Sequence, residues 1–189
     1  MARALDQDFY LRDTELVARA LLGQWLVHRF ESGEEKRGRI VEVEAYLGAE
    51  DPACHTFGGR RTARVSSMYL EGGHSYIYLI YGLYHCLNVV TRSENEGEAV
   101  LIRALEMPYD PVLGPPPLRM RQTNGPGKLC RHFHLDKRHD GLKLGKKRSG
   151  LWIEEGSAVS RKKIVAAPRV GVDSAGEAAN WRLRFFEAG

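Results

Sequence analysis

The chain has 189 residues, of which 43% are hydrophobic and 28% charged, with a formal net charge of +4. This balance is typical of a soluble globular protein and excludes collagen-like, coiled-coil and intrinsically disordered chains. The apolar runs are too short for a transmembrane helix, and the N-terminus lacks the apolar core of a signal peptide, so we expect no membrane association. The charge is uneven: residues 111–170 hold 14 Lys/Arg and 4 Asp/Glu, whereas all other residues hold 14 and 20. A basic block of this kind predicts a polyanionic partner.

The cysteines are odd in number and have no disulfide spacing, which favours a reducing compartment. The alternative is that Cys54, Cys86 and Cys130 are simply small buried side chains without a role. The histidines that follow Cys130 match no zinc finger or ribbon spacing, so we expect neither a metal nor a cofactor.

The N-terminal half predicts one helix followed by strands. Asp13 is a candidate helix N-cap, and apolar residues recur at helical spacing from Leu16 to Leu21. Residues 47–73 contain five glycines and predict a long, functional loop. Strand patterns and a hairpin turn over 31–37 account for the remainder, with strands expected at Trp25–Phe30, Ile40–Tyr46, Tyr76–Tyr81, Tyr84–Thr91 and Ala99–Leu105.

The C-terminal half begins with five prolines between Met107 and Pro117. Such a segment excludes helix and central strand, and we interpret it as an internal connection within one domain. A short helix is predicted near Pro126–Phe133. Strands are predicted at Leu151–Ile153, Ile164–Ala167 and Leu183–Phe186. The expected fold is therefore α+β, a single domain over 1–189 with a curved, largely antiparallel sheet and a few short helices.

Two carboxylates lie close together in the strand at 40–46. Period-two alternation places Glu42, Glu44 and Tyr46 on one face and the apolar Val41 and Val43 on the other. One interpretation is an exposed, solvated hairpin face. The other is a general base at the edge of a pocket, because a partly buried carboxylate can take a proton from water near neutral pH.

Aromatic and amide side chains suggest a second group of candidates. His55 in the glycine-rich loop is either an ordinary polar side chain or a reader of a heteroaromatic edge. The tyrosines at 76, 78, 81 and 84 are either core or stacking groups, and Tyr81, beside Gly82 at a turn, is placed to project. Asn88 and Arg103 lie among apolar residues and therefore need polar partners or a ligand.

The segment from Asn124 to Lys128 precedes the short predicted helix. Backbone N–H groups at a helix start together with a lysine can bind a phosphate. The spacing is not that of a Walker A loop, so the segment alone is a weak indication of phosphate binding.

Several motifs in chain order resemble the alkyladenine (3-methyladenine, or methylpurine) DNA glycosylase family. The resemblance runs from about Phe9 to Phe186. Its most specific parts are GRIVEVEAYLG at 38–48, EDPACH at 50–55, YLIYGLYHCLN at 78–88, VLIRALE at 100–106, GPGKLC at 125–130 and RVGV at 169–172. Ala63, Val65 and His85 depart from residues found in other members.

The resemblance implies a role for each matching residue. Glu44 would be the general base that activates water, and Arg103 and the backbone of Val170 would help hold that water. Tyr81 would fill the gap that an extruded base leaves. Contacts to the phosphate backbone are expected from Arg60, Arg64 and Lys128. The remaining residues would form the base-binding pocket: Tyr46 and His55 would sandwich the base, Asn88 would disfavour the exocyclic amine of guanine, and Tyr78 would complete the wall.

The implied reaction is hydrolysis of the N-glycosidic bond of an alkylated or deaminated purine that is flipped out of duplex DNA, leaving an abasic site for base excision repair. The implied substrates are 3-methyladenine, 7-methylguanine and also ethenoadenine and hypoxanthine. No amine nucleophile accompanies Glu44, so no strand cleavage is expected. Two alternatives are a non-catalytic damaged-DNA-binding module and a hydrolase of free nucleosides. We expect a monomer, cytoplasmic and nucleoid-associated in a bacterium or nuclear in a eukaryote.

Overall fold

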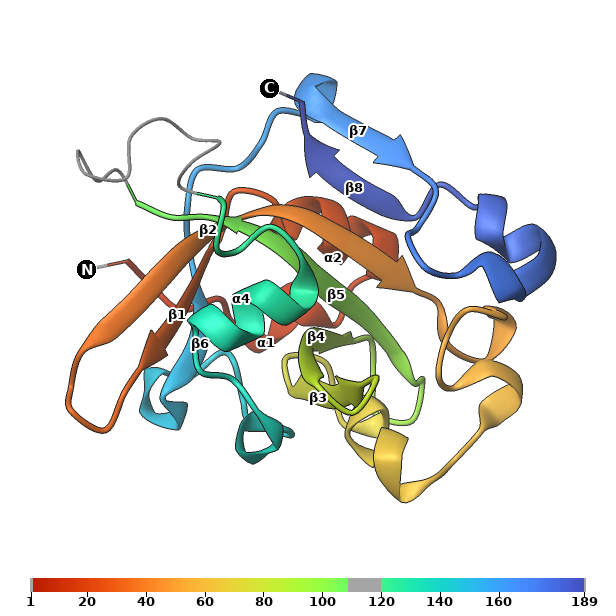
Figure 1. Cartoon of the computed structure of the whole chain (residues 1–189), viewed down its shortest axis with the longest axis horizontal. Coiled ribbons are helices and arrows are strands. Elements are labelled where there is room, and N and C mark those ends of the chain that lie inside the picture. Colours follow the sequence, from red (N-terminus) through yellow and green to blue (C-terminus); the bar gives the residue numbers. More distant parts are fainter. Residues whose placement is uncertain (1, 109–119, 189) are drawn as a thin grey trace.

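The computed structural model describes residues 2–108 and 120–188. Its main feature is a curved antiparallel sheet whose central order is β3-β4-β5-β2-β1-β6, with β8 beside β2 and β7 beside β8 (Figure 1). The strands are β1 (Trp25–Arg29), β2 (Glu35–Tyr46), β3 (Ser75–Ile80), β4 (Tyr84–Thr91), β5 (Glu98–Glu106), β6 (Leu151–Glu154), β7 (Ile164–Ala167) and β8 (Arg184–Glu187). The predicted α+β fold with a curved antiparallel sheet is confirmed.

The helices are short. They are α1 (Gln7–Tyr10), α2 (Thr14–Leu21) and α4 (Pro126–His132). Asp13 caps α2 as predicted, because its side chain accepts hydrogen bonds from the backbone N–H groups of Glu15 and Leu16. The sequence did not indicate α1, a single turn capped by Asp6.

The long strand β2 changes its neighbour halfway along. Its first half pairs with β1 from Glu35 to Arg39, so the strand begins earlier than the predicted Ile40, and the charged residues before it belong to the hairpin. A register shift between Ile40 and Glu42 marks a bulge, after which β8 pairs with Glu42–Glu44. With β5 on the other side throughout, the second half of β2 stays central, which is why its carboxylates are screened from water.

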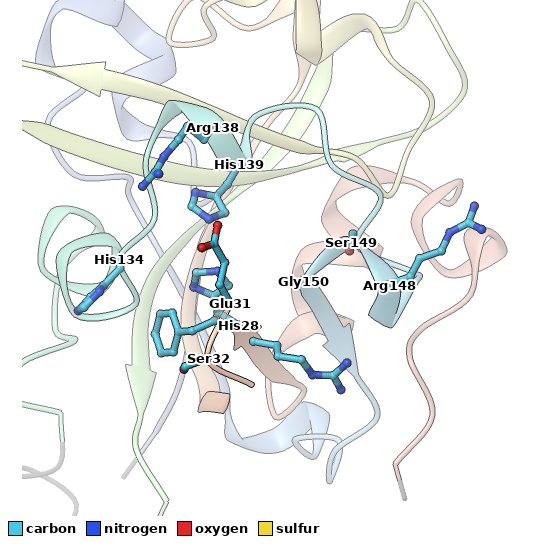
Figure 2. A pocket seen from close by; sticks show the side chains of 11 residues that line it. His28, Glu31, Ser32, His134, Arg138, His139, Arg148, Ser149 and Gly150 are labelled. Atoms are coloured by element: carbon cyan, nitrogen blue, oxygen red, sulfur yellow. The ribbon is translucent and has the colours of Figure 1, made fainter. Parts of the chain in front are cut away.

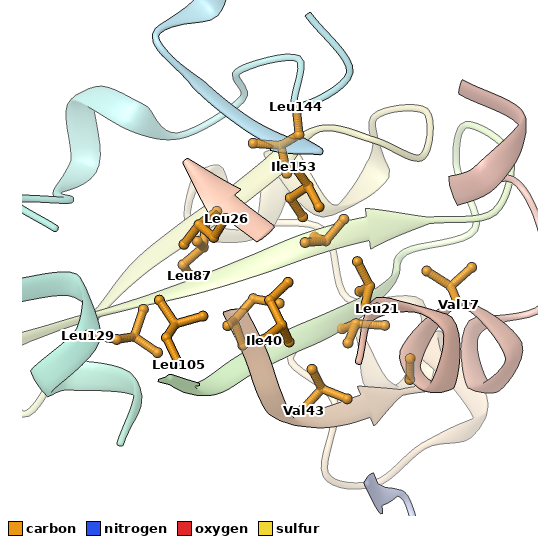
Figure 3. Packing of buried hydrophobic residues seen from close by; sticks show 14 of the residues in the cluster. Val17, Leu21, Leu26, Ile40, Val43, Leu87, Leu105, Leu129, Leu144 and Ile153 are labelled. Carbon is orange, nitrogen blue, oxygen red and sulfur yellow. The ribbon is translucent and has the colours of Figure 1, made fainter. Parts of the chain in front are cut away.

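Apolar side chains from α1, α2, α4 and every described strand except β7 form one continuous core (Figure 3). Val17 and Leu21 of α2 pack on Val43 of β2, and Leu129 of α4 lies near Leu105 of β5. Because elements from both ends of the chain share this core, we propose that residues 1–189 form a single domain.

The predicted long loop after β2 contains the 3-10 turns Gly48–Glu50, Phe57–Gly59 and Ala63–Tyr69. Its buried residues make a second apolar cluster with Tyr76 and Val90 of the sheet. All three cysteines are buried. Most of the predicted proline-rich connection, residues 109–117, lies outside the described residues. In the described part of the chain, every helix is too short to cross a bilayer.

Candidate active site

Glu44, near the end of β2, is completely buried, with 0% of its surface exposed. Its Oε1 accepts a hydrogen bond from the backbone N–H of Val170 at 2.8 Å and lies 3.2 Å from Nη1 of Arg103. Its Oε2 accepts a hydrogen bond from the Tyr46 hydroxyl at 2.9 Å. A carboxylate offers about four lone-pair positions, so these contacts with described residues leave one position on Oε2. The exposed-face interpretation is therefore wrong for Glu44.

The electrostatic setting of Glu44 is that of a proton acceptor. Burial raises the pKa of Glu44 above its usual range, outweighing the nearby Arg103 and the two hydrogen-bond donors, and the neighbouring Glu42 raises it further. Glu42 is itself held 3.0 Å from Nε of Arg103 and 3.0 Å from Nη1 of Arg184. The two carboxylates therefore lie on one face of β2, as predicted. A buried carboxylate with a raised pKa and an open lone pair fits general-base chemistry.

Tyr46, whose hydroxyl donates to this carboxylate, lines a cavity of about 130 Å³, and Glu44 itself is not part of the cavity wall. That volume is well below the roughly 300–1,000 Å³ of pockets for drug-sized ligands, so the cavity suits one flat ring system. Aromatic and apolar side chains make up most of its wall, which consists of Tyr46, Ala53, Cys54, His55, Met68, Tyr76, Tyr78, Ile80, Asn88, Ala99, Gly171 and Val172. The Tyr46 hydroxyl connects this wall to Glu44.

His55 forms one side of the cavity together with two tyrosines of β3. Its Nδ1 lies 2.9 Å from the hydroxyl of Tyr76, and its ring meets the ring of Tyr78 edge-on at 4.6 Å between centroids. The rings of Tyr76 and Tyr78 are stacked, with centroids 5.4 Å apart. Burial, with Arg64 and Arg60 nearby, lowers the pKa of His55 below its usual range. The imidazole is therefore neutral at physiological pH, with one donor and one acceptor nitrogen.

Asn88 of β4 is 4% exposed and lines the same cavity. Its Nδ2 donates to the carbonyl of Tyr76 at 3.1 Å and to the carbonyl of Cys86 at 3.5 Å. These two backbone carbonyls hold the amide in place. They are the polar partners that the sequence predicted for this buried side chain.

Tyr81 lies outside the cavity, at the turn between β3 and β4. It is 84% exposed and has a φ of 53°, and Gly82 after it has a φ of 68°. The backbone N–H of Leu83 donates to the carbonyl of Ile80 at 3.1 Å and closes the turn. Two successive positive φ values are the mark of a tight hairpin turn. The prediction that this ring projects is confirmed.

The cations expected on phosphates lie at different places. Arg64 lies over the ring of Tyr78, 5.6 Å from its centroid, and Arg60 is exposed on the same loop. Lys128 is exposed on α4 and makes no hydrogen bond or ion pair that involves the described residues. The start of α4 packs against β4, since a Cβ at Gly127 would lie 3.0 Å from Cβ of Tyr84. Phosphate binding by these three residues stays a prediction.

A larger cavity, of about 650 Å³, lies elsewhere, at the turn after β1 (Figure 2). Its wall contains His28, His134 and His139, with the Glu31 carboxylate pointing toward His139 in the view. Two of its arginines already have partners, because Arg29 pairs with Glu35, and Arg138 pairs with Asp136. None of the expected site residues is found there, and we do not assign this cavity to the chemistry.

Sequence reasoning gave no role to several residues of the site. Tyr76 positions His55, and Gly171 and Val172 close the cavity. Val170, which the family resemblance did assign, is 51% exposed and contributes its backbone N–H to Glu44 rather than to a water, so no side-chain pattern could identify it. A sequence signal for this segment is the glycine at 171, because glycine favours the left-handed conformation. The structure shows that conformation there, with a φ of 74°.

The family model described as methylpurine-DNA glycosylase (MPG) matches residues 8–189. A protein of Bdellovibrio bacteriovorus named "Putative 3-methyladenine DNA glycosylase" is 57% identical over 185 residues, which cover 96% of this chain and 94% of that protein. Proteins of the same name from Herpetosiphon aurantiacus and Bacillus cereus are 46% and 42% identical, over 97% and 96% of this chain and 86% and 94% of their own lengths. The chain therefore belongs to the methylpurine-DNA glycosylase family.

Proposed function

We propose that this protein is a DNA glycosylase that hydrolyses the N-glycosidic bond of alkylated or deaminated purines flipped out of duplex DNA. The observation that carries the proposal is Glu44: a buried carboxylate with a raised pKa and one open lone pair, next to an aromatic cavity the size of one ring system. The names of the curated relatives support activity on 3-methyladenine.

In the proposed reaction, Glu44 takes a proton from a water that attacks C1′, and the electron pair of the glycosidic bond leaves with the base. A cationic purine departs as a neutral molecule, whereas a neutral purine must also take up a proton from solvent or from a donor in the cavity. Loss of the base gives the sugar oxocarbenium character, and the Glu44 carboxylate stabilises that positive charge. Arg103 and the Val170 N–H keep the carboxylate oriented, so that its open position faces the reacting atoms.

The cavity would bind the extruded base. Tyr46 and His55 would sandwich it, with Tyr78 completing the wall, and the electron-rich ring faces would attract the positive charge of an alkylated purine. With Nδ1 engaged by the Tyr76 hydroxyl, the neutral His55 presents Nε2 to the base edge, as an N–H donor in the tautomer in which Tyr76 donates to Nδ1. The fixed Asn88 amide would disfavour the exocyclic amine of unmodified guanine without excluding 7-methylguanine, whose positive charge adds to its binding. Tyr81 would enter the stack in place of the base.

The test is release of base from a duplex that carries one 3-methyladenine or 1,N6-ethenoadenine. We expect abasic sites that break in alkali with the native protein and at least about a 100-fold slower rate with Glu44→Gln, which keeps the shape but cannot take a proton. Glu154→Gln is the matched control, because Glu154 is also a buried strand carboxylate (4% exposed) with basic partners, Arg37 and Lys147, but it lies on β6, where it pairs with β1.

The result that contradicts the mechanism is full activity in Glu44→Gln. Lesion-specific binding without any base release by the native protein would instead indicate a damaged-DNA-binding module. We also propose that the enzyme does not cleave the strand, because none of the residues that line the cavity is a lysine. Strand breaks that appear without alkali would refute this point. The monomeric state and the cellular compartment stay predictions.

A further inference from the structure

A buried ion pair lies behind the proposed base-binding cavity, and none of the roles given above uses it. The side chains of Asp51 and Arg169 are both completely buried, at 0% exposure. Nη2 of Arg169 donates to Oδ1 of Asp51 at 2.8 Å, and Nη1 donates to Oδ2. A bidentate pair of this kind is geometrically specific, and it is costly to bury unless each partner is well matched.

The pair joins three segments of the site. The Asp51 carboxylate also accepts hydrogen bonds from the backbone N–H groups of Leu47 and Ala53, each at 3.0 Å. Arg169 donates to the carbonyl of Ala45 at 3.0 Å, and the residue after it is Val170, whose N–H holds Glu44. The end of β2, the loop that leads to His55 and the segment at 169–172 are therefore held together at one point.

Arg169 also contacts the ring of Tyr46. Its guanidinium carbon lies over that ring, 4.8 Å from the centroid. Tyr46 lines the cavity, whereas the buried Arg169 does not. Because Arg169 covers one face of the ring and is not part of the cavity wall, we infer that the cavity lies at the opposite face.

A cation behind the ring affects which bases the cavity binds. A base stacked about 3.5 Å in front of Tyr46 would lie roughly 8 Å from the guanidinium. At an effective dielectric constant of about 20, repulsion between two unit charges at that distance weakens binding by roughly 10- to 30-fold. An unpaired Arg169 would therefore oppose a cationic base and leave a neutral base unaffected. Asp51 brings the net charge behind the ring to zero.

We propose that Asp51 is a specificity-determining positioning residue, whose carboxylate neutralises Arg169 behind Tyr46 and so allows the cavity to accept a cationic purine. This inference rests on the proposed function insofar as the cavity binds a flipped base. The inference goes beyond that function in one respect: Asp51, which does not line the cavity, determines whether the cavity tolerates a positively charged base.

The test compares duplexes that carry 7-methylguanine, which is cationic, or its neutral isostere 7-methyl-7-deazaguanine. Dissociation constants are measured by fluorescence anisotropy, with every protein built on Glu44→Gln so that no base is released. We expect Asp51→Asn to weaken binding of the cationic base about tenfold relative to the isostere. The readout is the ratio of the dissociation constant for the cationic base to that for the isostere. We expect Arg169→Gln to lower this ratio, because the negative charge of Asp51 then has no partner and attracts the cationic base.

Two further variants separate charge from structure. The double variant Asp51→Asn/Arg169→Gln carries no charge behind the ring and should restore the ratio of the parent, as should Arg169→Lys, which keeps the charge. A merely structural role for the pair would weaken both duplexes alike and leave the ratio unchanged. Ratios within twofold of the parent in both single variants, or shifts in the same direction, overturn the proposal.

If Asp51→Asn does not fold, the direction in which Arg169→Gln changes the ratio of dissociation constants is enough to support or overturn the proposal. Because the readout is binding, it also separates the two proposals. Native protein that releases no base contradicts the proposed catalysis, whereas an unchanged ratio contradicts only the role of Asp51.

Discussion

Arg103 is the residue whose removal should change the pH dependence of the reaction most. Its Nη1 lies 3.2 Å from Oε1 of Glu44, and its side chain is only 14% exposed. Two unit charges at that distance interact by about 5 kcal/mol at an effective dielectric constant of about 20. Arg103 also serves Glu42 at 3.0 Å, which reduces its effect on Glu44. Since Arg103 lowers the pKa of Glu44 against the effect of burial, its loss must raise that pKa further.

Loss of Arg103 should therefore displace the acidic limb of the pH–rate profile for base release. Activity requires the carboxylate form of Glu44, so the rate falls as the pH drops through its pKa. In Arg103→Gln we expect this limb to move to higher pH by about 1–3 units, the range typical of a carboxylate beside a guanidinium. The assay is single-turnover base release between pH 4 and 9, with circular dichroism at each pH to verify folding.

Arg184→Gln is the matched control for Arg103. Arg184 pairs with Glu42 at 3.0 Å and is 25% exposed, but it makes no ion pair with Glu44 in the described structure. Its loss should displace the limb by less than about half a unit. An acidic limb that stays in place in Arg103→Gln, or moves to lower pH, would show that Glu44 is not the titrating base.

Two other predictions concern DNA binding. Tyr81→Ser should leave the melting temperature unchanged, because the ring is 84% exposed. It should weaken lesion-specific binding by about tenfold in an anisotropy titration. A variant that binds lesion duplexes as tightly as the native protein would exclude Tyr81 as a wedge. Affinity for undamaged DNA should fall with salt with a log–log slope of about −3 or steeper, as contacts from Arg60, Arg64 and Lys128 to phosphates require, and a flat response would contradict these contacts.

Local patterns predicted most of the fold. The alternation in 84–91 defines β4 with its observed bounds, and Asp13 marks the start of α2. The start of β2 was placed five residues late, because Glu35–Arg39 look like a charged turn. They form a strand since β1 supplies their backbone partners, which is information that the residues themselves do not contain.

The site was predicted less evenly than the fold. Period two placed Glu42, Glu44 and Tyr46 on one face, but their burial depends on β8, whose pairing with β2 joins residues far apart in the chain. The apolar neighbours of Arg103 indicated only that it needs a polar partner, and the role of Val170 came from the family resemblance alone. The Asp51–Arg169 pair spans 118 residues, and neither residue has a local pattern that indicates the other. Such contacts follow from the closed fold and cannot be deduced from spacing.

The turn that carries Tyr81 also has a consequence for engineering. A left-handed backbone costs a non-glycine residue about 1–2 kcal/mol, and at this turn Tyr81 adopts it with a φ of 53° while its ring remains in solvent. Among the described residues, little covers the ring that could offset this cost. A screen for thermostability would therefore tend to replace Tyr81 with glycine or asparagine. Such a variant would be more stable but would lack the proposed DNA wedge.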